Sequence, residues 1–299
     1  IYRCDWSSDV CSSDLILNIH PEDIYSVIAC GISKKIKKSL KIYFVNHADH
    51  AFTYGATVAD FWFEISLLGK EIDDLRNIKA NRTFLGIPIN KPDSDFFKNV
   101  NYTSLLHSTN FMTAASSIKY KPFNNQSIFP LINKLLTSNK NLSVSVIGVD
   151  IMRNYWWWFI KLRFFNKLKL YKSLPYEKYM EITKKADCYI DSHPMPGGTA
   201  FVEQFLNGIP CIGLKSNFFG YTPLEKIKKN SVEEIIYQLK NSPLEEEIKS
   251  IQELIFEVHG FSQVRNRFRN TLKNFIVSNN PMVDNIENKD LTFFTNKNI

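Results

Sequence analysis

The densest group of residues that could do chemistry lies in DCYIDSHPMPGGTAFVEQFLNGIPCIGL, residues 187–214. Gly197 and Gly198 would let the backbone approach a ligand closely. Thr199 stands where a helix should begin, and free N–H groups at a helix start attract phosphate. Glu203 follows one turn later on the same helix face, where its carboxylate could accept hydrogen bonds from two ribose hydroxyls. The spacing predicts a site for a nucleoside diphosphate.

Two alternatives remain open in this stretch. A glycine-rich loop is by itself a weak signal, so the loop could merely turn the chain and leave Glu203 solvated. His193, in the same loop, could contact a bound sugar or phosphate, or it could be satisfied by the backbone.

A second reactive group is NHADHAF, residues 46–52, which follows an apolar run. A neutral imidazole with a pKa near 6.5 is a suitable general base toward a hydroxyl, and a carboxylate can hold its tautomer. We expect His50 to be the base, His47 to be a nearly equal rival, and Asp49 to orient the base or contact the acceptor. The alternatives are a metal site, which lacks a third ligand here, and a polar strand end that hydrogen-bonds to backbone.

These groups need elements to hold them in place. Strand and helix signals alternate from Ile16 onward, which predicts βαβ units and parallel sheets of the α/β class. In the 187–214 stretch a strand, a loop, a helix and a second strand follow in order, so the loop should lie at the carboxyl edge of a sheet. We expect strands at 41–45, 83–87, 111–116, 142–148, 187–191 and 209–214, and helices at 59–68, 128–136, 176–185, 199–207, 232–239, 244–259 and 261–276.

The stretch 187–214 resembles the donor-binding half of GT-B glycosyltransferases. It is most similar to the catalytic region of the O-linked N-acetylglucosamine transferase and to related bacterial glycan enzymes. Those families carry Gly-Gly-Thr, a Glu-containing helix, Gly-x-Pro and an apolar strand, as in residues 197–199, Glu203 and 208–210 here. The resemblance implies that Gly198 and Thr199 hold the donor diphosphate and that Glu203 holds the ribose.

Two further stretches extend the resemblance. TAASSIKYKP, residues 113–122, is similar to the start of the family's C-terminal domain, where a Lys three positions before a Pro reaches the diphosphate. That register makes Lys119 the matching cation and Lys121 its nearby substitute, and a fixed cation would stabilise the leaving diphosphate. An exposed strand charge is the alternative for either lysine. NHADHAF, with Gly55 and Asp60 downstream, resembles a motif of bacterial sugar transferases in the acceptor-side half.

The length of 299 residues corresponds to about two domains. Residues 1–15 lack an initiator Met and any structural period, and we interpret them as a non-native, adapter-like segment. We expect 16–110 to be the remainder of a truncated N-terminal acceptor-side domain, 111–277 the C-terminal nucleotide-sugar donor domain and 278–299 a flexible tail. The predicted fold is therefore GT-B, with two Rossmann-like domains.

Composition excludes several classes of protein. With 44% hydrophobic and 22% charged residues, the chain is not of a disordered, collagen-like or coiled-coil class. The net charge of +7 comes without dense Lys/Arg tracts, so no nucleic acid is expected as a partner. Beyond residue 15 the cysteines are odd in number and lack CxxC spacing, which indicates reduced thiols and a cytoplasmic location. The Asp-x-Asp at 93–95 is interpreted as a solvated loop, so neither metal nor cofactor is expected.

Residues 151–172 (IMRNYWWWFIKLRFFNKLKLYK) hold eight aromatic and six basic residues and no acid. One interpretation is a segment lying on an anionic membrane, which would suit a lipid-linked glycan acceptor. The other is a core helix, because Trp157, Ile160, Phe164 and Leu168 recur at helical spacing.

We therefore expect a metal-independent glycosyltransferase of the hexosyl or N-acetylhexosaminyl type. It would move a sugar from a nucleoside diphosphate sugar, with UDP favoured, to a hydroxyl of a glycan, lipid-linked glycan or protein. The alternatives are a nucleotide-sugar epimerase of the same fold and a non-catalytic nucleotide-sugar-binding module in polysaccharide assembly.

Overall fold

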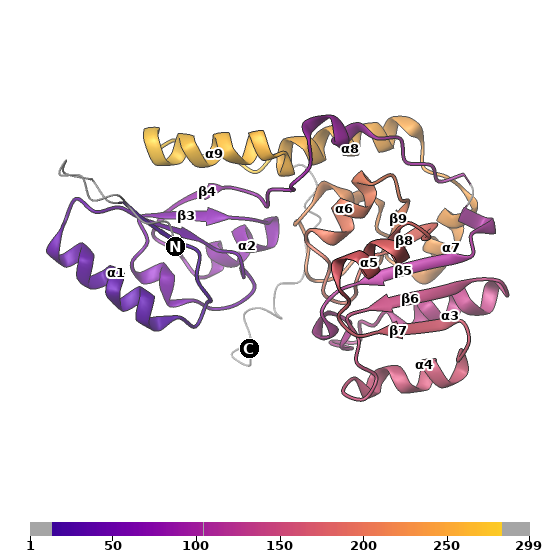
Figure 1. The fold of residues 1–299 in the computed structure, drawn as a ribbon. Helices are drawn as coiled ribbons and strands as arrows, with labels where there is room; N and C mark the ends of the chain where they lie inside the picture. The colour runs from indigo at the N-terminus through magenta and orange to yellow at the C-terminus, as the bar shows by residue number, and fades with distance from the viewer. Residues whose placement is uncertain (1–13, 104, 283–299) are drawn as a thin grey trace.

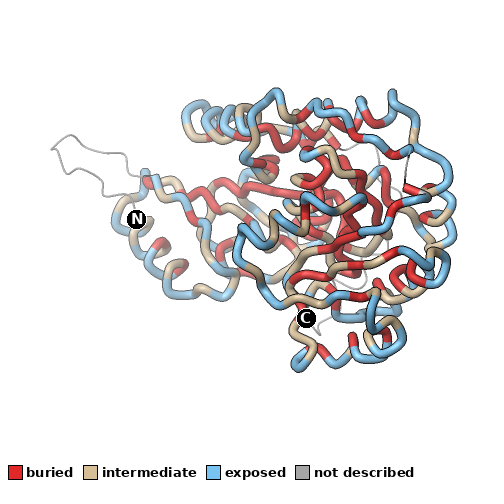
Figure 2. Tube along the Cα trace, turned by 45° about the vertical axis from the view of Figure 1, so that its right-hand side comes forward, coloured by how far each residue is buried: buried red, intermediate tan, exposed pale blue. Residues whose placement is uncertain are grey.

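The computed structural model describes residues 14–103 and 105–282. Two α/β units lie side by side in Figure 1, each built on a sheet in which every strand pair is parallel. Buried residues run along the strands of both units, as the red segments of Figure 2 show. The prediction of an α/β fold with two such units is confirmed.

The N-terminal unit contains a four-stranded sheet in the order β1-β2-β3-β4. Helix α1 connects β1 to β2, and α2 connects β3 to β4. The bounds are β1 Leu15–Leu17, α1 Ile24–Ile36, β2 Ile42–Val45, β3 Phe61–Glu64, α2 Leu67–Leu75 and β4 Asn81–Phe84. The first strand thus begins at the last residue of the segment interpreted as non-native; residues 1–13 of that segment lie outside the described residues.

The helix expected at 59–68 is wrong. Its first half is the central strand β3, whose four residues are all buried. Burial on both faces removes the alternation that identifies a strand, so an apolar run of this kind does not distinguish strand from helix. Helix α2 begins only after Ser66, whose hydroxyl accepts a hydrogen bond from the Gly69 N–H at 2.8 Å.

The C-terminal unit contains a five-stranded sheet in the order β7-β6-β5-β8-β9. The chain adds β6 and β7 on one side of β5, and then β8 and β9 on the other. The strands are β5 Asn110–Ala114, β6 Ser143–Ile147, β7 Leu168–Tyr171, β8 Cys188–Ile190 and β9 Cys211–Ile212, and the helices are α3 Phe129–Ser138, α4 Trp158–Arg163, α5 Tyr176–Thr183, α6 Ala200–Leu206, α7 Val232–Lys240 and α8 Glu245–His259. Open α/β sheets bind ligands where the strand order reverses, here between β5 and β8.

The chain returns to the N-terminal unit at its end. Helix α9, Phe261–Asn274, follows α8 directly and lies along the N-terminal unit in Figure 1. Its Val264 and Phe268 pack against Tyr43 and Phe63 of the N-terminal sheet. The N-terminal unit therefore covers the apolar face of α9, although the sequence of α9 lies in the stretch expected as the donor domain.

Residues 278–282, expected as the start of a flexible tail, also pack on the N-terminal unit. The Phe84 N–H donates to the Ser278 carbonyl at 2.9 Å, and the Ser278 N–H donates to the Thr83 hydroxyl at 2.9 Å. Met282 is buried in a cluster with Leu67. Backbone pairing with β4 and apolar burial hold this part of the chain.

Candidate functional site

The glycine-containing loop, residues 191–199, joins β8 to α6 at the point where the strand order reverses. Its first residue, Asp191, is buried and anchors it: Oδ1 accepts from the Gly197 N–H at 2.8 Å, and Oδ2 lies 2.7 Å from Lys228 Nζ. A Cβ at Gly197 would lie 3.1 Å from that Oδ1 atom, so the tight turn leaves little room for a side chain. The loop conformation is therefore set before any ligand binds.

Lys228 was not found by sequence reasoning, since no motif or spacing relates it to the loop. Its side chain is buried against Asp191, and Nζ lies 5.1 Å from the centre of the Phe201 ring. Burial by itself would lower the pKa of Lys228, but the carboxylates of Asp191 and Glu225 raise it above its ordinary value. The ammonium is thus the permanent counter-charge of the loop anchor.

Lys119, but not Lys121, reaches the loop. Its Nζ donates to the Pro196 carbonyl at 2.9 Å, while its own carbonyl accepts from the Met195 N–H at 3.3 Å. Burial lowers the pKa of Lys119; Asp191 opposes this shift and Lys228 adds to it. Lys121 is exposed and follows a fully buried tyrosine in the chain.

Thr199 and Glu203 lie one turn apart at the start of α6. Thr199 is the N-cap residue and is exposed, and its carbonyl accepts the first helical hydrogen bond from the Glu203 N–H at 2.9 Å. Glu203 is half-buried, and within the described residues no hydrogen bond or ion pair engages its carboxylate. A Cβ at Gly198 would lie 3.6 Å from Ile87 Cδ1. The loop thus faces the N-terminal unit.

His193 is turned into the protein, with 5% of its surface exposed. Burial lowers its pKa to about 4; Lys228 lowers it further, and a hydrogen bond with the Leu214 backbone opposes the shift. The imidazole is therefore neutral at neutral pH. The Leu214 backbone is a partner of the ring, whereas Nδ1 is buried without a hydrogen-bond partner among the described residues, so the backbone does not satisfy the whole imidazole.

Asp49 of NHADHAF connects the two units. Its carboxylate is buried, accepts from the Ser66 hydroxyl, and accepts from the Tyr221 hydroxyl of the C-terminal unit at 2.7 Å. Burial, followed by the nearby Asp49 charge, raises the pKa of Tyr221 well above its ordinary value, so the phenol remains the donor. A Cβ at Gly69 would lie 2.8 Å from Asp49 Cβ, which shows how closely α2 packs here.

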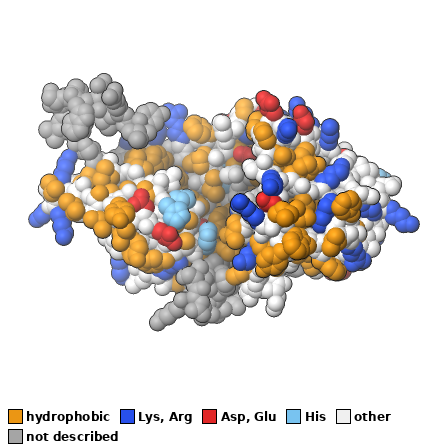
Figure 3. Space-filling view, turned by 60° about the horizontal axis from the view of Figure 1, so that its bottom comes forward, with side chains coloured by type: hydrophobic (Ala, Val, Ile, Leu, Met, Phe, Trp, Pro, Cys, Tyr) orange, Lys and Arg blue, Asp and Glu red, His pale blue; other side chains and the backbone are white. Residues whose placement is uncertain are grey.

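The two candidate bases have different surroundings. His50 Nδ1 lies 3.6 Å from Asp49 Oδ1, beyond a hydrogen bond, and its ring meets Phe218 of the C-terminal unit edge-on at 5.7 Å. His47 is exposed and lines a cavity of about 640 Å³. Figure 3 shows histidine side chains at the surface between the two halves of the molecule.

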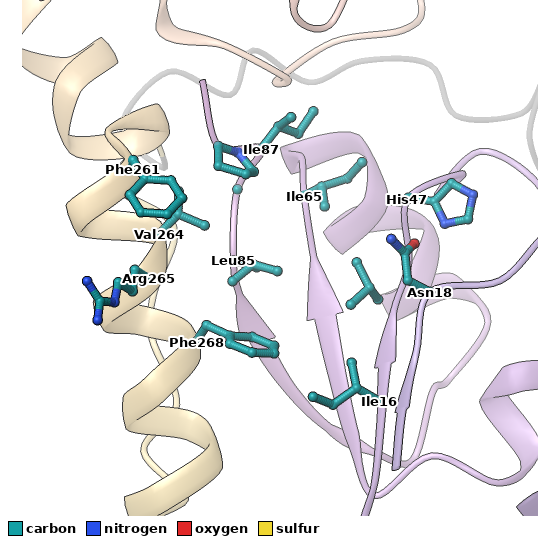
Figure 4. Close-up of a pocket in the computed structure, with 13 residues that line it drawn as sticks. Ile16, Asn18, His47, Ile65, Leu85, Ile87, Phe261, Val264, Arg265 and Phe268 are labelled. Carbon is teal, nitrogen blue, oxygen red and sulfur yellow. The ribbon is translucent and has the colours of Figure 1, made fainter. Parts of the chain in front are cut away.

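This cavity lies between the carboxyl ends of the N-terminal strands and α9 (Figure 4). Its lining is mainly apolar, with His47 and Asn18 on one side and Arg265 of α9 on the other. Ile87, which faces Gly198, also lines it. The cavity therefore adjoins the glycine-containing loop, and a molecule bound there would have an imidazole beside it.

The Asp-x-Asp at 93–95 lies in a short 3-10 helix, Asp93–Phe97, between the two units. Asp95 pairs with Lys98 at 3.3 Å, and Asp93 accepts from the Ser262 hydroxyl at 3.4 Å. Within residues 14–103 and 105–282, no group of three or more His, Cys, Asp or Glu side chains is placed to hold a metal ion.

Solved structures share this architecture. A Thermobaculum terrenum O-GlcNAc transferase mutant superposes with a TM-score of 0.54 at 13% identity, over 83% of this chain and 54% of that one. The Anabaena protein HepE, in complex with UDP-glucose, superposes with a TM-score of 0.54 at 13% identity. The match covers 84% of this chain and 76% of HepE. Sucrose-phosphate synthase from Thermosynechococcus elongatus has a TM-score of 0.56 at 9% identity. That match covers 83% of this chain and 72% of the synthase.

The chain has the GT-B fold. At these identities the similarity concerns the fold alone. The chain spans about half the length of the O-GlcNAc transferase, at 54%. No family model and no curated protein matches the sequence.

Proposed function

We propose that this chain belongs to a glycosyltransferase that moves a sugar from a UDP-sugar to an acceptor hydroxyl. The observation that supports it best is that Lys119 contacts the glycine-containing loop at the point where the strand order reverses. Its Nζ lies 2.9 Å from the Pro196 carbonyl oxygen. Two GT-B neighbours are described with UDP-glucose or with UDP and GlcNAc, which favours UDP.

On the donor side, the backbone at Gly198 and Thr199 binds the diphosphate, Gly197, whose N–H is held by Asp191, keeps the loop in shape for it, and Glu203 binds the ribose. Lys119 supplies a cation to the leaving group, the role for which other transferases use a divalent metal. When the bond between the anomeric carbon and the diphosphate breaks, its electron pair goes to the diphosphate oxygen. The positive charge of Lys119 stabilises the negative charge that develops on that oxygen.

On the acceptor side, His47 is the preferred general base, because it lines the cavity beside the loop whereas His50 is packed at the contact between units. The imidazole takes the hydroxyl proton as the acceptor oxygen bonds to the anomeric carbon. The acceptor is a glycan, a lipid-linked glycan or a protein hydroxyl, and the sugar is a hexose or N-acetylhexosamine.

Calorimetric titration of the chain with UDP, GDP, CMP and dTDP tests the donor site. We expect UDP to bind, Glu203→Ala to lose that binding, and Glu253→Ala, an exposed carboxylate of α8, to retain it. A folded protein that binds none of the four nucleotides would overturn the proposal.

Turnover then separates the alternatives. A transferase consumes UDP-sugar only with an acceptor and loses turnover in His47→Ala while UDP binding persists. Formation of an epimerised UDP-sugar without an acceptor would identify an epimerase instead. Binding that both histidine variants leave unchanged, with no turnover, would identify a binding module.

A further inference from the structure

The connection between β6 and β7 presents a large apolar surface to solvent. Trp157 and Ile160 are buried and fix it to the C-terminal unit, and Trp156 and Phe164 pack partly against the same core. The helix is shorter than the spacing predicted, because Leu168 already belongs to β7. Six other large apolar side chains are at least half exposed and form what we call the α4 surface: Met152 (78% exposed), Tyr155 (67%), Trp158 (50%), Phe159 (78%), Leu162 (77%) and Phe165 (69%).

Single exposed apolar residues are ordinary, but a contiguous group marks an interaction surface. Helix α4 has six residues, and three of them, Trp158, Phe159 and Leu162, are at least half exposed. Figure 3, seen from the side on which α4 lies in Figure 1, shows hydrophobic and basic side chains together over the C-terminal unit.

The charge of this connection is mainly positive. Residues 151–172 contain six Lys or Arg and no acid, and Asp150, which precedes them, lies 3.0 Å from Lys172 and 3.9 Å from Arg153. Lys161 bends back over the end of α4: its Nζ donates to the Phe165 and Leu168 carbonyls at 2.6 and 2.7 Å and lies 4.7 Å from the Phe165 ring. The Lys161 ammonium is thus held beside an exposed ring.

We propose that the α4 surface binds the headgroup region of an anionic lipid bilayer, with α4 lying in the membrane plane. Tyr and Trp favour the headgroup level, aliphatic side chains enter the acyl boundary, and Lys and Arg meet the anionic lipids. A second copy of the chain fits less well, because a two-fold contact would place the same cations opposite each other. Nucleic acid fits less well because Met152 and Leu162 offer bases neither stacking nor hydrogen bonds.

Co-sedimentation with vesicles tests this contact. The full chain should bind vesicles of equal phosphatidylcholine and phosphatidylglycerol, bind pure phosphatidylcholine far more weakly, and dissociate as salt is raised. The double variant Phe159→Ser/Leu162→Ser should lower the partition coefficient at least about tenfold. Ile28→Ser/Ile32→Ser is the matched control: these two α1 side chains are 51% and 54% exposed, and their loss should leave binding unchanged.

Tryptophan fluorescence gives a second readout. Among the described residues, Trp158 is half exposed, Trp156 is partly buried, and Trp62 and Trp157 are buried, so Trp158→Phe should remove most of a blue shift caused by anionic vesicles. Failure of the folded chain to bind anionic vesicles, or equal loss in the α1 control, would overturn the proposal. The proposal would also be overturned if the chain dimerised in sedimentation equilibrium, or bound RNA, and the α4 double variant abolished that association. UDP titration of the same variants keeps this result separate from the donor site, which the proposal does not need.

Discussion

Lys228→Met tests whether the buried ion pair holds the glycine-containing loop in place. The ammonium and the Asp191 carboxylate are 2.7 Å apart, with side-chain exposures of 3% and 1%. Methionine keeps most of the volume but leaves the carboxylate buried without its counter-charge, and breaking such a pair costs about 3–5 kcal/mol. For a chain of this size we expect Tm to fall by about 10 °C. Because Asp191 also holds the Gly197 N–H, UDP affinity should fall about tenfold.

Thermal denaturation by circular dichroism and calorimetric UDP titration measure the two effects. Lys226→Met is the matched control, since Lys226 is an exposed lysine of the same connection and should change neither quantity. Adding Asp191→Asn to Lys228→Met removes the unpaired charge while keeping an oxygen for Gly197, and should restore part of the lost Tm. The reasoning is refuted if Lys228→Met melts within a degree or so of Lys226→Met.

Three further predictions follow from the same geometry. Lys119→Met should weaken UDP binding about tenfold in calorimetry, whereas Lys121→Met, at an exposed lysine, should not. If both variants weakened UDP binding equally, the contact of Lys119 with the loop would not be what matters, only the net positive charge. Gly69→Ala should lower the free energy of unfolding, measured in urea, by about 1–3 kcal/mol, because the new Cβ would lie 2.8 Å from Asp49 Cβ. The control is Gly31→Ala in α1, where the new Cβ would lie 3.6 Å from its nearest neighbour, and this change should be neutral or stabilising. If Gly31→Ala proved the more destabilising of the two, the packing argument would be contradicted. Since burial lowers the His193 pKa to about 4, the unfolded chain binds more protons at this residue between pH 4 and 6.5, so the contribution of His193 to stability should fall as pH falls over that range. In urea denaturation, the free energy of unfolding of the parent chain should therefore fall relative to that of His193→Gln between pH 6.5 and 4.

Several elements were predictable because local chemistry and burial agreed. The stretch 187–214 was expected as strand, loop, helix and strand, and the structure contains β8, the loop, α6 and β9 in that order. Strand β6 alternates buried and half-buried residues along its first four positions, which is the pattern its sequence predicts. By contrast, β3 is buried on both faces, so its sequence has no such pattern and was mistaken for helix.

The candidate site divides in the same way. The glycine-containing loop and the NHADHAF group were recognised as chemically capable from residue types and short spacing. Their roles in catalysis and binding stay predictions. Lys228 and Tyr221 were missed, because each acts through a partner far away in the chain: Lys228 through Asp191 and Tyr221 through Asp49.

The sequence by itself determined the α/β class, the order of most elements and the residue types that could bind a nucleotide sugar, since these depend on hydrophobic period and turn chemistry over a few neighbours. Only the tertiary structure decided which lysine reaches the loop, since Lys119 donates to the Pro196 carbonyl whereas Lys121 is exposed. It also decided that Asp49 joins the two units, and which aromatic residues of 151–172 remain in solvent. Those outcomes depend on packing between distant segments, which spacing along the chain does not encode.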